Sequence, residues 1–152
     1  MRKIVAGLLV LSSVAVTTGA LAQTDSAKVV TRMQRYAGYL KTGPVDSVAG
    51  SFAADGQLIS PGMDPVKSPA GIQGFLTPLV AAFTVDSCTM TAEKVELFGA
   101  TALEWGDYTQ RAGPKGGAMA DYHGRFVAEL QKQADGQWKI ARLFMQPAPP
   151  GS

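Results

Sequence analysis

The sequence ALEWGDYTQ, which begins at residue 102, places two carboxylates and a glycine inside a predicted β-strand. Glycine weakens the interior of a strand unless the chain bends there or another group approaches closely. Because side chains alternate between the two faces of a strand, Glu104 and Tyr108 share one face and Asp107 lies on the other. A carboxylate on a covered face needs a partner. We interpret the segment as a strand bent at Gly106, with a ligand-binding wall as the alternative.

Nucleophilic and metal-dependent chemistry find little support in the residue types. The chain has a single cysteine, Cys88, and a single histidine, His123. One of each is too few for the usual zinc ligand sets, so no metal and no other cofactor is expected. Nothing in the sequence places the two side chains together as a nucleophile and its base. Cys88 is interpreted as a buried or half-buried strand residue, and a lone cysteine excludes an internal disulfide framework.

The N-terminus has the layout of a cleaved secretory signal. Two basic residues precede an apolar run over residues 4–16, and the sequence Ala-Leu-Ala at 20–22 offers small residues before a cleavage point. The apolar run is short for a transmembrane helix, so stable membrane insertion of the mature chain is not expected; an uncleaved N-terminal anchor is the alternative. We expect residues 1–22 to be removed near Ala22-Gln23 and the mature protein to be periplasmic or secreted.

The charge of the mature chain names no partner. The full sequence has 14 Lys and Arg against 12 Asp and Glu, and residues 1–22 hold two of the basic side chains and no acidic one. Cleavage would therefore leave 12 of each sign. No basic tract remains that would indicate nucleic-acid binding.

Helical periodicity dominates the first half of the mature chain. An amphipathic helix is predicted over residues 25–41, and a short second helix follows it. Asp55-Gly56 indicates a turn before a short strand over residues 57–60. After a loop over residues 61–69, a third helix is predicted from Ala70, with Pro78 kinking or splitting it.

Strand periodicity dominates the second half. Long strands are predicted over residues 86–98, 101–111, 121–133 and 137–146, followed by a flexible proline-rich tail over residues 147–152. Helices followed by such a meander predict an α+β fold, with three helices packed on a strongly curved antiparallel sheet. No repeat or linker divides the chain, so residues 23–146 are expected to form a single domain.

The order of these elements resembles the nuclear transport factor 2-like (cystatin-like cone) fold and, within it, the SnoaL-like group of small bacterial domains. The resemblance covers residues 28–146. It is carried by segments in matching order and spacing, namely FAADG at 52–56, AGI at 70–72, VELFG at 95–99, GDY at 106–108, GRF at 124–126 and DGQWKIAR at 135–142. It implies a cone whose helices cover one face of a bent sheet.

The resemblance also implies two kinds of activity. Enzymes with this fold isomerise ketosteroids, cyclise polyketides, dehydrate substrates or open epoxides, with an aspartate or an Asp/His pair in a mostly apolar pocket. A tyrosine or an aspartic acid holds the developing oxyanion, as proton abstraction next to a carbonyl requires. This sequence departs from the pattern at Leu143, where such domains often carry an acidic residue, and at Ser68-Pro69, where they often carry a glycine. The first departure removes a candidate base.

The candidate ligand-binding residues are polar side chains expected near the cone interior: Tyr36, Tyr39, Asp55, Glu104, Tyr108, His123 and Arg142. Asp55 fits closure of a turn better than the role of a base, and His123 fits a solvated or dimer-facing surface. Arg142 lies between two apolar positions of its strand face, so we expect it to be buried and paired with Glu104 or another carboxylate. No catalytic residue is assigned.

Three functions follow as hypotheses. The first is an exported domain that binds a small, largely hydrophobic molecule in an apolar cavity, as a homodimer through the open sheet face. The second is an acid–base enzyme of the isomerase, cyclase or dehydratase kind, with Asp55, Glu104 or Asp107 as the base. The third is an assembly module that pairs chains and binds no ligand.

Overall fold

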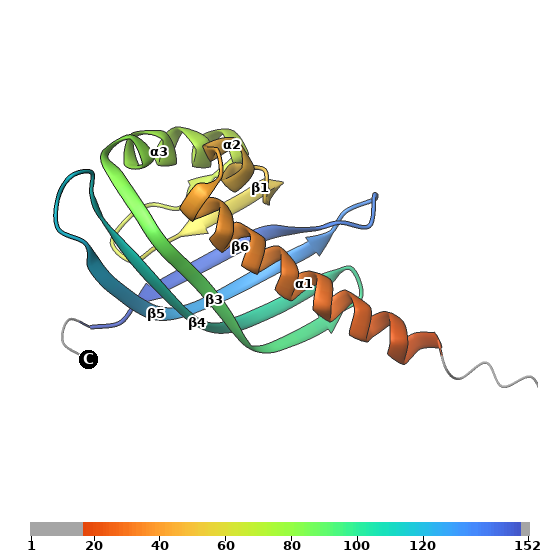
Figure 1. Cartoon of the computed structure of the whole chain (residues 1–152). Helices are drawn as coiled ribbons and strands as arrows, with labels where there is room; N and C mark the ends of the chain where they lie inside the picture. Colours follow the sequence, from red (N-terminus) through yellow and green to blue (C-terminus); the bar gives the residue numbers. More distant parts are fainter. Residues whose placement is uncertain (1–16, 150–152) are drawn as a thin grey trace, which may run out of the picture.

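The computed structural model describes residues 17–149, which form three helices and a single sheet (Figure 1). Residues 1–16 of the predicted signal segment and residues 150–152 of the predicted tail lie outside the described residues. Within the described part, no helix is long and apolar enough to cross a membrane. The elements are α1 (Thr17–Thr42), α2 (Val45–Ala49), β1 (Phe52–Ile59), β2 (Val66–Lys67), α3 (Ser68–Ala82), β3 (Phe83–Phe98), β4 (Thr101–Pro114), β5 (Ala120–Lys132) and β6 (Trp138–Pro147).

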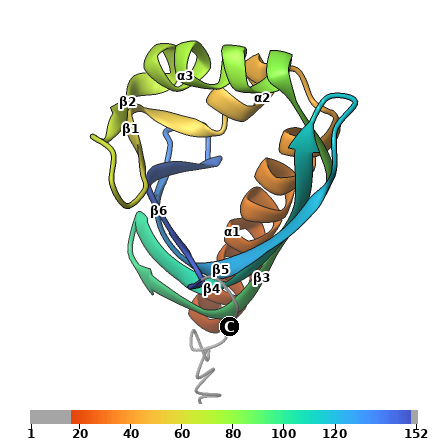
Figure 2. The same cartoon turned by 90° about the vertical axis from the view of Figure 1, so that its left-hand side faces the viewer.

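The sheet has the strand order β2-β1-β6-β5-β4-β3. All neighbouring strands are antiparallel, as predicted, except β1 and β6, which are parallel. The sheet curls strongly, α1 runs along its concave side, and α2 and α3 lie across one end (Figure 2). The predicted α+β cone with three helices on a strongly curved sheet is confirmed.

Several element boundaries differ from the predictions. The predicted turn at Asp55-Gly56 is wrong: both residues lie inside β1, which is one strand with an irregular register. A Cβ on Gly56 would lie 2.8 Å from Cβ of Phe52, so the close local packing of this irregularity requires glycine. Pro78 lies within α3 and does not end it. At the C-terminus, the amide of Ala148 still donates to the carbonyl oxygen of His123, so the sheet extends into the predicted tail.

The interior of the cone is filled by its own side chains. The largest fully buried apolar ones come from all three helices and from β1, β5 and β6, and they belong to a single apolar cluster under the concave face of the sheet. The ring of Tyr36 meets that of Phe52 edge to face, with the ring centroids 5.8 Å apart. Filling of this kind accounts for the stability of a domain of this size, and it confines open space to the ends and edges of the cone.

Bending of β4 depends on a bulge in the neighbouring strand. The pairing of β3 with β4 shifts between Ala92 and Lys94, which places an extra residue in β3 opposite Gly106. A Cβ on Gly106 would lie 2.0 Å from the carbonyl oxygen of Thr91, so no side chain fits there. The glycine at the centre of this strand is therefore explained by sheet curvature and close backbone approach.

Candidate functional site

The face of β4 that carries Glu104 turns toward the helices. Ala102, Glu104 and Tyr108 are 0%, 1% and 5% exposed, whereas Asp107 on the opposite face is exposed. Asp107 instead binds Arg125 of β5 on the outside of the sheet, at 3.0 Å. Of the two carboxylates in this strand, only Glu104 lies inside the cone.

Glu104 is buried without a polar partner. Neither of its carboxyl oxygens accepts or donates a hydrogen bond, and both are shielded from solvent. Its register neighbours on β3 and β5 are Val95 and Ala128, which offer no side-chain donor. Loss of water raises the pKa of Glu104 to about 7. At neutral pH this carboxyl is thus divided between its neutral and charged forms.

Arg142 does not pair with Glu104, and its predicted burial is wrong. Its guanidinium is exposed and donates to the Glu129 carboxylate at 2.8 Å, so it does pair with a carboxylate, but on the outer face. The cause is a bulge in β6: Glu129 pairs with Arg142 while the next residue of β5 pairs with Ile140, which leaves Ala141 as an extra residue. One inserted residue moves every later side chain of the strand to the opposite face.

Buried Tyr36 and Tyr108, from α1 and β4, lie near the partly buried Cys88 of β3. Burial raises the pKa of both tyrosines, and the negative charge that Cys88 would carry as a thiolate raises them further, which places the three side chains close together. Burial also raises the pKa of the Cys88 thiol to about 11. All three groups therefore remain neutral near pH 7 and act as dipoles, not as charges.

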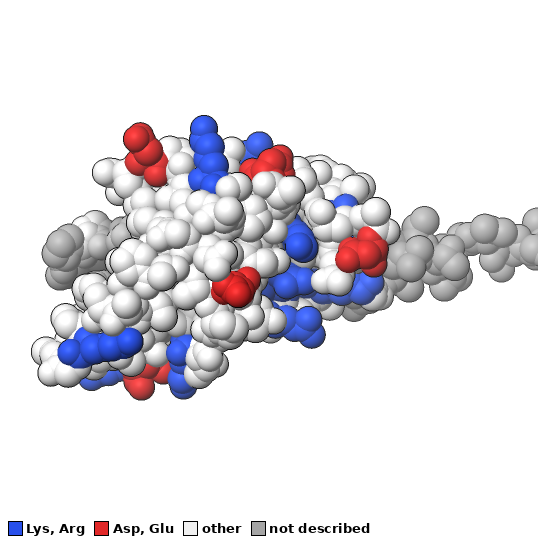
Figure 3. Space-filling view, turned by 90° about the horizontal axis from the view of Figure 1, so that it is seen from above, with Lys and Arg blue, Asp and Glu red and all other residues white. Residues whose placement is uncertain are grey.

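A groove of about 430 Å³ opens at the end of the cone that α3 covers. Its wall is largely apolar: α3 contributes Leu76, Leu79 and Val80, and the start of β3 contributes Phe83 and Val85. Leu79, Val80 and Phe83 are 40–44% exposed, which is unusual for large apolar side chains that lie together. The surface over α3 is largely uncharged in the view from above (Figure 3).

The groove lining also contains polar side chains, which together are called the groove margin. They are Tyr39, Lys41, Thr84, Gln110, Lys115 and Tyr122, and no Asp or Glu is among the lining residues. Tyr36 and Tyr108 are buried and are not among the lining residues. The site thus combines an apolar wall with hydroxyl, amide and ammonium groups.

The structure brings some of the candidate residues together and separates others. Tyr39 lines the groove, whereas Tyr36, Tyr108 and Glu104 are buried in the cone and do not line it. Asp55 and His123 are exposed and do not line the groove. Among the described residues, no group of three His, Cys, Asp or Glu side chains could hold a metal ion.

Sequence reasoning did not single out the residues that make the groove wall. Leu79, Val80 and Phe83 belong to the apolar pattern of the third helix and read there as core positions. The composition of α3 could have revealed this surface. The helix has no charged residue, although only two of its side chains, Ile72 and Leu76, are buried. A helix that is more apolar than its burial requires indicates a surface for binding.

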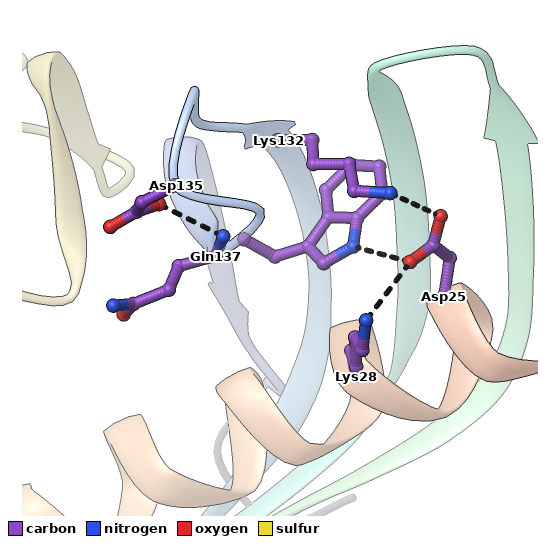
Figure 4. A network of polar contacts seen from close by, with 6 residues as sticks. Asp25, Lys28, Lys132, Asp135 and Gln137 are labelled. Atoms are coloured by element: carbon purple, nitrogen blue, oxygen red, sulfur yellow. Dashed lines mark hydrogen bonds and ion pairs between the residues drawn. The ribbon is translucent and has the colours of Figure 1, made fainter.

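A second cavity, of about 540 Å³, lies between the N-terminal half of α1 and the loop joining β5 to β6. Its charged groups are mostly used to hold these two elements together. The Asp25 carboxylate accepts from Lys132 at 2.7 Å and from the Trp138 indole at 3.5 Å, and it also pairs with Lys28 (Figure 4). Arg32 donates through Nε to the carbonyl oxygen of Trp138 at 2.7 Å. We interpret this region as a clamp that fixes α1 against the hairpin.

Comparison with known proteins agrees with the fold. A search of curated proteins found no match. Among solved structures, a protein of unknown function from Mycobacterium tuberculosis is similar with a TM-score of 0.79, 18% identity, and coverage of 90% of this chain and 79% of that one. A conserved protein from Planctomyces limnophilus gives a TM-score of 0.76 at 16% identity, over 84% of this chain and 98% of that one. A ketosteroid isomerase-like protein from Erwinia carotovora gives a TM-score of 0.66 at 16% identity, over 86% of this chain and 96% of that one.

The family assignment rests on the sequence. The model of the SnoaL-like domain matches residues 22–143, which is most of the chain and includes every element from β1 to β5. The similarity to these solved structures shows that this chain shares their fold, and the protein from Erwinia carotovora among them is described as ketosteroid isomerase-like. The chain belongs to the SnoaL-like domain family.

Proposed function

We propose that this domain binds a small, largely hydrophobic molecule in the groove between α3, β3 and the end of α1. The observation that carries the proposal is the apolar groove wall, with Leu79, Val80 and Phe83 left partly open to solvent. The volume of about 430 Å³ lies in the range of small-molecule sites in proteins. An exposed apolar surface of this kind costs free energy in the empty protein, and a ligand that covers it recovers that free energy.

The acid–base enzyme is the second candidate, and Glu104 is the observation in its favour. A carboxyl with a pKa of about 7 suits proton transfer. However, both of its oxygens are shielded, Glu104 does not line the groove, and Gln110, the nearest lining residue on the same face of β4, lies six positions further along the strand. Asp55 and Asp107, the other proposed bases, are exposed and do not line the groove. The geometry therefore favours binding over catalysis.

Binding is tested by titrating the protein with N-phenyl-1-naphthylamine, a neutral probe that fluoresces in apolar surroundings. We expect saturable binding to the wild type and about tenfold weaker binding to the double variant Leu79→Gln/Val80→Gln, because each change removes roughly half a side chain of apolar contact. Val127→Gln is the matched control, since Val127 is 49% exposed on the outer sheet face. Equal binding to all three proteins, or none to the wild type, would exclude this site.

Export and pairing complete the proposal. The sequence of residues 1–22 supports export with cleavage before Gln23. Edman sequencing of the protein purified from its own host should then begin at Gln23. An N-terminus that begins earlier in the sequence would exclude cleavage at this position. A homodimer through the outer sheet face is supported by Val127 and Phe144, which are 49% and 47% exposed on adjacent strands. If the protein is instead an assembly module without a ligand, it should still form this dimer but should not bind the fluorescent probe.

A further inference from the structure

We propose that the groove selects hydrophobic molecules that carry one anionic head group, such as a carboxylate. This inference rests on the proposed binding function and specifies the class of ligand. Its basis is the charge of the groove margin: among the lining residues of the part of the chain that the structure describes, Lys41 and Lys115 are the only Lys or Arg, and none is acidic.

The two lysines come from separate elements and their charges are not neutralised. Lys41 lies in the last turn of α1 and Lys115 in the loop between β4 and β5. Neither forms an ion pair with any described residue, whereas other lysines of this chain, such as Lys94 and Lys132, do. Asp46 of α2, near the groove, accepts a hydrogen bond from Gln73 at 2.6 Å and does not line the groove. The charge left at the margin is therefore positive.

The backbone holds both lysines in fixed places. The amide of Lys115 donates to the carbonyl oxygen of Ala82 at 2.9 Å, which ties the loop to the end of α3. The amide of Gly43 donates to the carbonyl oxygen of Tyr39 at 2.9 Å and closes the end of α1 next to Lys41. Binding would then require ordering of the lysine side chains alone, which limits its entropic cost.

An apolar wall with ammonium groups at its rim matches an amphipathic anion. The hydrocarbon part would cover the wall, and the head group would remain at the rim, partly hydrated and close to the lysines. Exposed ion pairs of this type contribute up to about 1 kcal/mol each, which corresponds to about fivefold in affinity. A neutral molecule of the same length gains binding free energy from its apolar contacts alone.

The test compares decanoate with decanol as competitors of N-phenyl-1-naphthylamine, both below the concentration at which they aggregate. We expect decanoate to displace the probe at about tenfold lower concentration than decanol, and this preference to shrink when the ionic strength is raised. In Lys41→Gln and Lys115→Gln the affinity for decanoate should fall about fivefold each, while that for decanol and for the probe stays unchanged. Lys67→Gln is the matched control, because Lys67 is exposed and does not line the groove.

The outcomes separate the two proposals. If the probe and both competitors fail to bind, the proposed function and this inference both fail. If decanol and decanoate bind equally well, or if the lysine variants bind decanoate like the wild type, binding stands and selection by charge is wrong. Thermal unfolding of each variant establishes that it is folded. We expect all of them to fold, because the substituted side chains are exposed.

Discussion

Glu104 is the residue whose surroundings differ most from what its chemistry prefers. A neutral carboxyl without partners already leaves a donor and two acceptors unsatisfied, and its ionised form is costlier still. The residues around it in the sheet, Val95 and Ala128, cannot compensate. Glu104 therefore lowers the stability of the fold, increasingly so as the pH rises.

The pH dependence of stability follows from the raised pKa. Because burial moves the pKa of Glu104 from 4.5 to about 7, the folded state binds a proton that the unfolded state has released across this window. Stability should therefore fall as the pH rises from about 4.5 to about 7, by up to about 3 kcal/mol from this group, and then level off. Glu104→Gln should match the wild type near pH 4.5 and exceed its stability at pH 8.

Urea denaturation of both proteins at several pH values measures this difference. Asp64→Asn, at an exposed position in the loop before β2, is the control and should follow the wild type at every pH. A stability difference between Glu104→Gln and the wild type that does not change with pH would show that the carboxyl is solvated in solution.

At the scale of the elements, irregular pairing shapes the cone. Register shifts occur in β1, twice in β3 and between β5 and β6, and each adds residues to one strand that bend or twist it: three in β1 and one at each of the others. Two glycines accommodate the resulting contacts: a Cβ on Gly106 would meet Thr91, and one on Gly124 would lie 2.2 Å from the carbonyl oxygen of Gln146.

Alanine at position 106 tests this account. Gly106→Ala should lower the free energy of unfolding by about 2 kcal/mol or more, since the new methyl group can be accommodated only by displacing the β3 backbone. Gly74→Ala is the matched control: nothing lies within 4 Å of the added Cβ in α3, so stability should rise by up to about 1 kcal/mol. Equal effects of the two changes, measured by thermal unfolding, would contradict the close approach.

At the scale of the whole molecule, the surfaces divide into distinct roles. The α3 end holds the groove, the opposite end of α1 is clamped to the β5–β6 hairpin through Asp25 and Arg32, and the outer sheet face combines apolar side chains with ion pairs. A face with Val127 and Phe144 half exposed between charged pairs suits contact with a second copy through a two-fold axis.

The proposed dimer predicts a specific response to charge. The double variant Val127→Lys/Phe144→Lys should sediment as a monomer while the wild type sediments as a dimer, because burying two ammonium groups per chain would oppose association. Val80→Lys, which adds a charge at a similarly exposed position of the groove, should leave the dimer intact. A monomeric wild type at micromolar concentration would show that this face does not pair chains.

Much of the architecture could be predicted from periodicity. The helix containing Tyr36 and the long strands repeat apolar residues with the spacing that burial of one face demands, so their type and order were confirmed. The turn signal at Asp55-Gly56 failed because pairing of β1 with β6 outweighs local turn preference. The predicted position of Arg142 on the covered face was wrong because the bulge at Ala141 cannot be recognised from the alternation of apolar and polar residues.

The amino-acid sequence by itself determined the family and the element order. It also showed that Glu104 and Tyr108 share one face of their strand, and left open whether this face or the opposite one is covered by the helices. Only the tertiary structure decided which face is covered, that Glu104 lacks a partner, and that Lys41 and Lys115 stand at one apolar groove. The physical reason is the range of the interactions. Backbone periodicity is a local property, whereas partners, cavities and charge balance depend on residues that are far apart in the chain.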